Sequence, residues 1–299
     1  MNKKYFTPKK IHAYLRAAIQ LVFFLFLPSA FTTAFSGIKS VLTQIGAGNP
    51  IAWSSFLTVL LALCAYTIVF GRFFCGYACA FGTLGDAVHS LYLFLCKKCK
   101  KKPLLLKKSW KKPLSYLKYA VLLAVVLLCF LGVYGDLTGW SPWDVFSMLR
   151  SGNFKVGAYW LGCILLVLIL VGMVFCERFF CRFLCPMGAV FSLLPILPFF
   201  SVRRKREKCA KGCTACEKVC PSDLSLPEDG SWDREKPIGC SSASGSIETP
   251  GECFQCQKCL EICPKKNAKS SIRNFRGNEI WFTLLRAVVL AAVLILAGI

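Results

Sequence analysis

The sequence is poor in histidine and in acidic residues. It contains only two histidines, His12 and His89, and 15 Asp and Glu residues against 37 Lys and Arg. Two histidines on facing helices can hold a haem, but neither of these lies in the middle of an apolar run, so we expect no haem. Nothing in the sequence resembles a substrate pocket, and we do not expect a stand-alone enzyme.

The scarcity of acidic residues leaves a formal net charge of +22, whose distribution along the chain is informative. Five Lys and Arg fall in residues 1–16, ten in 71–112 and seventeen in 176–278, whereas residues 36–50 and 135–156 hold one and two. This alternation is the positive-inside pattern of membrane proteins. It places the basic segments in the cytoplasm and argues against nucleic-acid binding.

Apolar residues are abundant, at 56% of the chain, and they gather in separate runs of about 20 residues, the length that crosses a bilayer. We predict five transmembrane helices, at residues 11–35, 51–74, 113–134, 157–175 and 281–299. A signal peptide competes for the first run, but its long basic start and the second run soon after it favour an uncleaved helix. Residues 80–95 and 189–200 are too short to span, and the first of them is predicted to be an interfacial or re-entrant helix.

One motif occurs twice, each time at the end of an apolar run. The first motif, residues 72–79, reads R-F-F-C-G-Y-A-C, and the second, residues 178–185, reads R-F-F-C-R-F-L-C. Both are followed by a short apolar segment and a basic tract. The chain is therefore predicted to contain an internal repeat in parallel orientation, with both motifs at the cytoplasmic face.

Nineteen cysteines are far more than usual, and most fall on the predicted cytoplasmic side, where disulfides rarely persist. Two runs of four cysteines, here called ferredoxin runs, each end in Cys-Pro. The second ferredoxin run along the chain, Cys253-x2-Cys256-x2-Cys259-x3-Cys263-Pro264, has the bacterial spacing for a [4Fe–4S] cluster. The first ferredoxin run, Cys209-x3-Cys213-x2-Cys216-x3-Cys220-Pro221, has one extra residue in its first gap. In paired runs the fourth cysteine turns to the other cluster. The predicted ligand sets are thus Cys209, Cys213, Cys216 and Cys263 for cluster 1, and Cys253, Cys256, Cys259 and Cys220 for cluster 2.

The motif cysteines Cys75, Cys79, Cys181 and Cys185 are predicted to form one shared metal site in the membrane, a third centre. Residues i and i+4 lie on one face of a helix, so each pair can supply two ligands. The alternative is that these small side chains only pack between helices. Arg72 and Arg178 either stabilise thiolate charge or anchor the helices at the membrane face.

Two other polar groups are open to more than one reading. Cys96 and Cys99 lie in a lysine-rich segment, which favours a reactive thiolate, but a plain loop fits as well. Asp86 and His89 could serve proton transfer to a quinol, or they could be an ordinary interfacial polar pair.

These patterns predict a mainly α, polytopic membrane protein with an inserted bacterial-type 2[4Fe–4S] ferredoxin domain in the cytoplasm. We divide the chain into a first membrane repeat, a second membrane repeat, the ferredoxin domain and a C-terminal helix that leads to the outer side. The boundaries are 1–112, 113–200, 201–278 and 279–299.

The two C-x3-C motifs followed by two ferredoxin runs resemble the membrane polyferredoxins of the NapH, NosR and CcoG type, over about residues 11–278. The first motif lacks the family's proline, having Ala80 where the second has Pro186. The resemblance implies a bacterial cytoplasmic-membrane protein that moves electrons between a cytoplasmic or quinol donor and a membrane or extracytoplasmic acceptor. A separate outer partner, carrying flavin or haem, is an expectation from the family.

Two other functions compete with electron transfer. Some family members serve the assembly of metalloenzymes, which makes an assembly or metal-reduction factor for a membrane oxidoreductase the second hypothesis. A membrane redox sensor that responds through Cys96 and Cys99 is the third.

Overall fold

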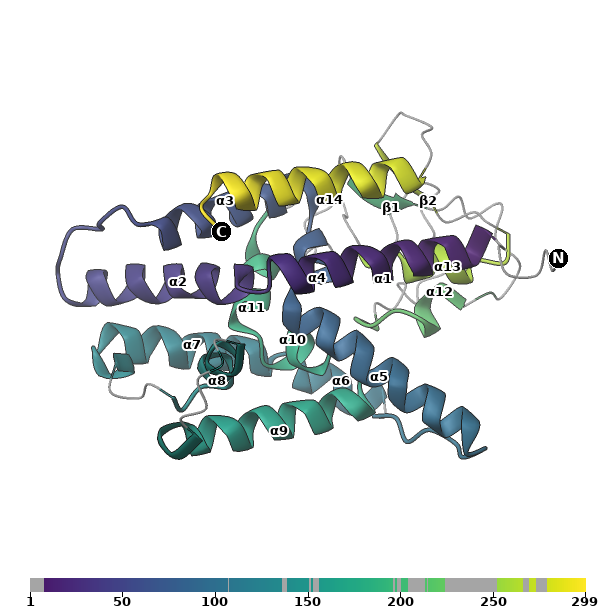
Figure 1. The fold of residues 1–299 in the computed structure, drawn as a ribbon, viewed down its shortest axis with the longest axis horizontal. Coiled ribbons are helices and arrows are strands. Elements are labelled where there is room, and N and C mark those ends of the chain that lie inside the picture. Colours follow the sequence, from purple (N-terminus) through teal and green to yellow (C-terminus); the bar gives the residue numbers. More distant parts are fainter. Residues whose placement is uncertain are drawn as a thin grey trace. The chain divides into compact units, whose positions relative to one another are not determined.

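A computed structural model of the protein describes most of the chain, with several gaps in the cysteine-rich region. The described residues are 8–106, 108–135, 139–150, 152, 156–195, 197, 200–203, 213, 215–223, 252–265, 269–272 and 279–299. Cys209, a predicted ligand of cluster 1, lies outside them. The described part is mainly helical and divides into two compact units that interleave along the chain (Figure 1).

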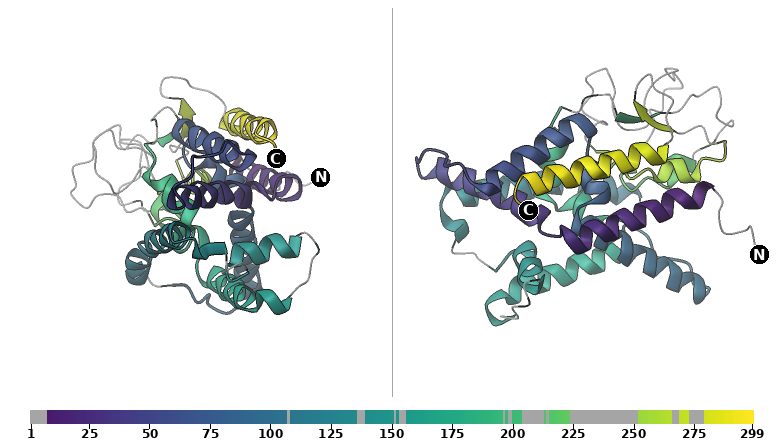
Figure 2. Two further views of the ribbon diagram at one scale, coloured as in Figure 1. Left: turned by 90° about the vertical axis from the view of Figure 1, so that its left-hand side faces the viewer. Right: turned by 45° about the horizontal axis from the view of Figure 1, so that its top comes forward.

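The first unit combines residues 1–26, 63–79 and 191–295, and so joins the N-terminal helix, the first motif and the cysteine-rich region. Its elements are α1 (Pro8–Phe26), the second half of α3 (Ser55–Phe70), α4 (Phe73–Tyr77), β1 (Phe200–Arg203), α12 (Ala215–Lys218), α13 (Lys258–Ile262), β2 (Lys269–Ile272) and α14 (Glu279–Leu296). Within this unit α13 packs against both α1 and α12, and α1 also contacts α4 (Figures 1 and 2).

The second unit combines residues 27–62, 80–190 and 296–299, and contains the second motif. Its elements are α2 (Ala30–Gly46), the first half of α3, α5 (Ala80–Lys98), α6 (Lys108–Leu114), α7 (Leu117–Phe130), η1 (Val133–Gly135), α8 (Pro142–Arg150), η2 (Val156–Tyr159), α9 (Trp160–Phe175), α10 (Phe179–Phe183) and most of α11 (Pro186–Leu193). Here α9 packs against α5, α8 and α10, while α2 packs against α7.

The prediction of a single helix over residues 11–35 is wrong. The chain forms α1 up to Phe26, breaks, and starts α2 at Ala30. Pro28 lies in the break, and a proline there has no backbone N–H for the helix and restricts the residue before it. Composition alone had suggested a continuous run, because every residue near the break is apolar or small.

The other apolar runs form helices, several of them shorter than predicted. In the described chain, α14 alone is long and apolar enough to cross a bilayer, and the helices covering 11–26 and 30–46 meet the same test only as a pair. The remaining apolar helices, α3, α7 and α9, have 14 to 16 residues. The count of five spans therefore stays a prediction. The short helix predicted at 80–95 is present as α5.

The strands β1 and β2 form a two-stranded antiparallel sheet that the sequence pattern does not predict. Phe200 of β1 pairs with Ile272 of β2, and Arg203 pairs with Lys269. The strands are only four residues long, so their alternation is too brief to recognise in the sequence. Their pairing places residues 200–203 beside residues 269–272 (Figure 1).

A group of three fully buried phenylalanines forms part of the core of the second unit. The ring centroids of Phe81 and Phe180 are 4.5 Å apart, and Phe31 lies 5.2 Å from Phe81 and 6.0 Å from Phe180. Phe180 comes from the second motif, so the motif also contributes to packing.

We predict that Phe180→Ala lowers the free energy of unfolding by about 3–5 kcal/mol, because the change leaves a cavity between aromatic rings. Thermal or denaturant unfolding in detergent measures the effect. Phe94→Ala is the control, since Phe94 is 63% exposed, and its effect should stay within about 0.5 kcal/mol. Equal destabilisation by both changes would contradict this account of the core.

Candidate functional site

Each motif folds as one turn of helix with the same closing hydrogen bonds. In the first motif, the N–H groups of Ala78 and Cys79 both donate to the carbonyl oxygen of Phe74, over 2.8 and 2.9 Å. In the second, the N–H groups of Leu184 and Cys185 donate to the carbonyl of Phe180, over 3.0 and 2.9 Å. Hydrogen bonds from two successive N–H groups to one carbonyl oxygen are a typical way to end a helix. The repeat seen in the sequence is therefore also a repeat of local structure.

The two cysteines of a pair do not share one helix, contrary to the prediction. Cys75 lies within α4, which ends at Tyr77, and Cys79 comes directly before α5. In the same way Cys181 lies within α10, and Cys185 comes directly before α11. The reason is the early closure of the turn, which stops the helix before it reaches the second cysteine. All four side chains are buried.

The position before a helix suits a thiolate. The N–H of Gly188 donates to Cys185 Sγ over 3.2 Å, as an N-cap acceptor is bonded by the third helical residue. Negative charge is favoured at a helix N-terminus by the backbone dipoles. Pro186, at the first position of α11, costs no hydrogen bond there.

The motif arginines are buried, not exposed at a surface. Both Arg72 and Arg178 have relative exposures of 0%. Arg178 has a left-handed backbone, with φ of 55°. At the first motif the left-handed residue is Gly71, directly before Arg72, with φ of 70°. Each motif thus begins with a left-handed residue that separates the long helix from the short one.

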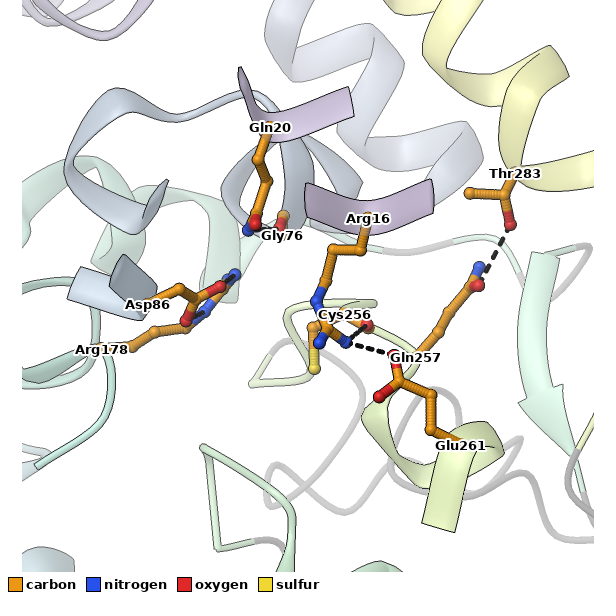
Figure 3. A network of polar contacts seen from close by, with 9 residues as sticks. All are labelled: Arg16, Gln20, Gly76, Asp86, Arg178, Cys256, Gln257, Glu261 and Thr283. Carbon is orange, nitrogen blue, oxygen red and sulfur yellow. Dashed lines mark hydrogen bonds and ion pairs between the residues drawn. The ribbon is translucent and has the colours of Figure 1, made fainter. Parts of the chain in front are cut away.

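Arg178 forms a bidentate ion pair with Asp86 of α5 in the second unit. Its Nε and Nη2 atoms donate to Asp86 Oδ1 and Oδ2 over 2.9 and 2.6 Å (Figure 3). His89 Nδ1 lies 3.0 Å from the carbonyl oxygen of Val174. Asp86 and His89 therefore have separate partners, which favours a structural role for both over proton transfer to a quinol.

The second ferredoxin run forms a tight loop followed by α13. The N–H of Gln255 donates to Cys253 Sγ over 3.4 Å, the kind of contact that adjusts the potential of a cluster sulfur. Burial and the nearby thiols of Cys256, Cys253, Cys220 and Cys216 raise the pKa of Cys259 well above its usual value. Four other cysteines, from both runs, are thus close enough to interact with one thiol.

The first ferredoxin run is described from Cys213 onward. Cys216 lies in α12, which packs against α13, and Cys220 follows it. The hydroxyl of Ser222 donates to the carbonyl of Glu252 over 2.7 Å, which ties the end of this run to the start of the other. Cys263, predicted as a ligand of cluster 1, is half-buried at the end of α13.

The cysteines in the described part of the chain are all in the thiol form, without disulfides. No set of three or more Cys, His, Asp and Glu side chains among these residues converges closely enough to hold one metal ion. The pairs Cys75/Cys79 and Cys181/Cys185 belong to different units, and their shared site stays a prediction.

Polar side chains of α1 contact both the first motif and the second ferredoxin run, and the sequence analysis missed them. Arg16 Nη1 donates to the carbonyl of Cys256 over 3.2 Å and to Glu261 Oε1 over 2.7 Å. Gln20 Nε2 donates to the carbonyl of Gly76 over 3.1 Å (Figure 3). An arginine inside an apolar run is costly unless it has a partner, so the position of Arg16 in the sequence could have indicated one.

Cys96 and Cys99 lie at the end of α5, with Cys96 half-buried and Cys99 exposed. Cys96 therefore lies on a helix and not in the predicted plain loop, and a redox role for the two cysteines stays a prediction.

Comparison with known proteins identifies the relatives of this chain. A family described as "4Fe-4S binding domain" matches residues 52–113 and 158–206, which contain both motifs. The protein MJ0750 of Methanocaldococcus jannaschii, uncharacterised, is 30% identical over 83% of this chain and 90% of its own length. The ferredoxin-type protein NapH of Haemophilus influenzae is 24% identical over 72% of this chain and 67% of its own.

The chain belongs to the membrane polyferredoxin family. Protein NirI of Paracoccus denitrificans is 26% identical over 73% of this polyferredoxin, which corresponds to only 31% of NirI. No solved structure matches the chain.

We predict that Asp86→Asn destabilises this polyferredoxin by about 3–5 kcal/mol, because it leaves the Arg178 charge buried without its anion. The free energy of unfolding in detergent measures the effect. A double variant, Asp86→Leu with Arg178→Met, should lose less than the single change, since it removes both charges. A double variant less stable than Asp86→Asn would contradict this account, in which the cost comes from the unpaired buried charge of Arg178.

Proposed function

We propose that this polyferredoxin is a membrane-bound iron–sulfur electron-transfer protein. It passes electrons between a cytoplasmic or quinol donor and a redox partner in the membrane or on its outer side. The observation that carries the proposal is the packing of α12, which holds Cys216 of the first ferredoxin run, against α13, which holds Cys259 of the second. The chain also belongs to a family whose members include a ferredoxin-type protein.

Two [4Fe–4S] clusters are the cofactors proposed for the two runs. Cys253, Cys256, Cys259 and Cys220 would hold one, and Cys209, Cys213, Cys216 and Cys263 would hold the other. Besides burial, cysteines of both runs, namely Cys256, Cys253, Cys220 and Cys216, raise the pKa of Cys259, and the division into two sets follows the ferredoxin spacing. The clusters, when bound, supply one-electron carriers. The chain itself contributes buried thiols, an N–H bond to sulfur and nearby cations.

A third centre at Cys75, Cys79, Cys181 and Cys185 is proposed on two grounds. The match to a 4Fe–4S binding family covers these four residues and none of the cysteines of the ferredoxin runs beyond residue 206. The two motifs also share one backbone geometry, with cysteines at equivalent places. Packing alone does not require such a match.

We propose that the protein lies in the bacterial cytoplasmic membrane, and the apolar surfaces of the helices support a location in a membrane. On α14, Trp281, Val288 and Leu296 are largely exposed, and on α9 so are Trp160 and Leu168. Such surfaces are unfavourable in water and suit lipid. From the charge pattern we propose that the N-terminus and the ferredoxin region face the cytoplasm and that the C-terminus lies outside.

We predict about eight irons and eight acid-labile sulfides per chain for the two ferredoxin clusters, with further iron if the third centre exists. A variant with Cys75, Cys79, Cys181 and Cys185 all changed to Ala should lose about two to four irons and keep the other signals. Iron and sulfide analysis with EPR measures this. Equal iron in both proteins would remove the third centre and leave the two clusters.

The donor is tested by adding reduced ferredoxin or quinol to the purified protein under anaerobic conditions. Electron transfer predicts bleaching of the cluster absorbance by at least one of the two. A protein with its full iron content that neither donor reduces would count against electron transfer and favour an assembly or sensing role.

A further inference from the structure

The loop that begins the second ferredoxin run lies directly on the first motif, within the first unit. The guanidinium carbon of Arg72 lies 4.8 Å from the centroid of the Phe254 ring, and Arg72 Nη1 lies 3.6 Å from Glu252 Oε2. Both Arg72 and Phe254 are almost fully buried. A cation on an aromatic face is attracted more strongly when water is excluded, so this contact holds the loop against the motif.

Gly76 makes the contact possible because it has no side chain. A Cβ at this position would overlap the carbonyl oxygen of Phe254, a backbone atom that cannot move alone. The corresponding residue of the second motif is Arg182, whose buried guanidinium lies over its own neighbour, Phe183, at 5.1 Å. The two motifs therefore differ at the one position where a docked loop requires open backbone.

Three further contacts hold the other end of the loop and the helix that follows it. Arg16 of α1 donates to the carbonyl of Cys256 and pairs with Glu261, and the hydroxyl of Thr283 on α14 donates to Gln257 Oε1 over 3.0 Å (Figure 3). Helices from both ends of the sequence thus bind one short loop. None of these side chains belongs to the ferredoxin spacing itself.

The loop is also strained, which indicates that its contacts define its shape. Gln255 and Gln257 have left-handed backbones, with φ of 54° and 59°, and each is 2% exposed. Such conformations are unfavourable for residues with side chains and persist where the surroundings impose them. The contacts around the loop therefore define its conformation.

We propose that the first motif is a docking site for the second ferredoxin run, formed by Arg72 and Gly76, and that Arg16 tunes the cluster held by that run. The cluster of the second run is then the one next to Cys75 and Cys79. This inference rests on the proposed function, because it requires a cluster in that run. Reduction adds negative charge to a cluster, so a nearby, partly buried cation such as Arg16 raises the reduction potential of that cluster.

The docking site is tested with Gly76→Ala in the full-length protein, with Gly157→Ala as the control, since a Cβ at Gly157 meets no atom within 4 Å. Hydrogen exchange of the amides of residues 252–257 is the measurement. Gly76→Ala should increase their exchange by about tenfold or more, and Gly157→Ala should leave it unchanged. Unchanged exchange in Gly76→Ala would overturn the docking site, whatever the iron content.

The role of Arg16 is tested by redox titration followed by EPR on the reconstituted protein. The signal lost in Cys253→Ser is assigned to the second run, and the signal lost in Cys213→Ser to the first. Arg16→Gln should lower the potential of the second-run signal only, and Glu261→Gln should raise it, because the two changes remove opposite charges from the same place. A purely structural effect would not reverse its sign between the two variants.

The outcomes separate this inference from the proposed function. A protein that takes up no iron or sulfide fails as an electron carrier. The tuning by Arg16 is overturned, and the proposed function is not, by any of three results in a protein with intact clusters. In these results, Arg16→Gln and Glu261→Gln leave every potential unchanged, shift the first-run signal, or shift the second-run signal in the same direction.

Discussion

The burial of arginine beside cysteine is the constraint on which the rest of this structure depends. Arg72, Arg178 and Arg286 are among the largest fully buried side chains of the described chain. A buried cation is costly unless partners compensate it. Arg178 has the carboxylate of Asp86, Arg72 has Glu252 and an aromatic face, and Arg286 lies over the ring of Phe73, 4.9 Å from its centroid. These requirements decide which segments pack together in each unit.

The cations also give the thiols a suitable environment. Clusters bound by thiolates carry negative charge, and a protein interior poor in water would destabilise that charge without nearby donors. The chain supplies such donors as N–H groups that bond to the sulfur atoms of Cys253 and Cys185, and as the guanidinium of Arg16 at the Cys256 carbonyl.

Local features of the sequence predicted local features of the structure well. The twice-written motif became the same closed turn twice, and the apolar runs became helices. The predictions that failed did so for identifiable reasons. Pro28 divided one apolar run into two helices, and the early closure at Tyr77 separated Cys75 from the helix that follows Cys79. Hydropathy does not register either effect, because it averages over residues whose backbone geometry differs.

Cysteine spacing along the chain is sufficient to indicate a ferredoxin-type site, because ligands three residues apart can reach one cluster only in a tight loop. The partner of that loop cannot be inferred in this way. Arg16 and Cys256 are 240 residues apart, and Gly76 and Phe254 also come from distant parts of the sequence. Only the folded chain brings them together, since such contacts depend on how helices pack and on which backbone is left open by a glycine. Gly76 and Arg182 occupy the same position of a repeated motif, and only the folded chain shows that the first contacts a loop and the second contacts its own neighbour.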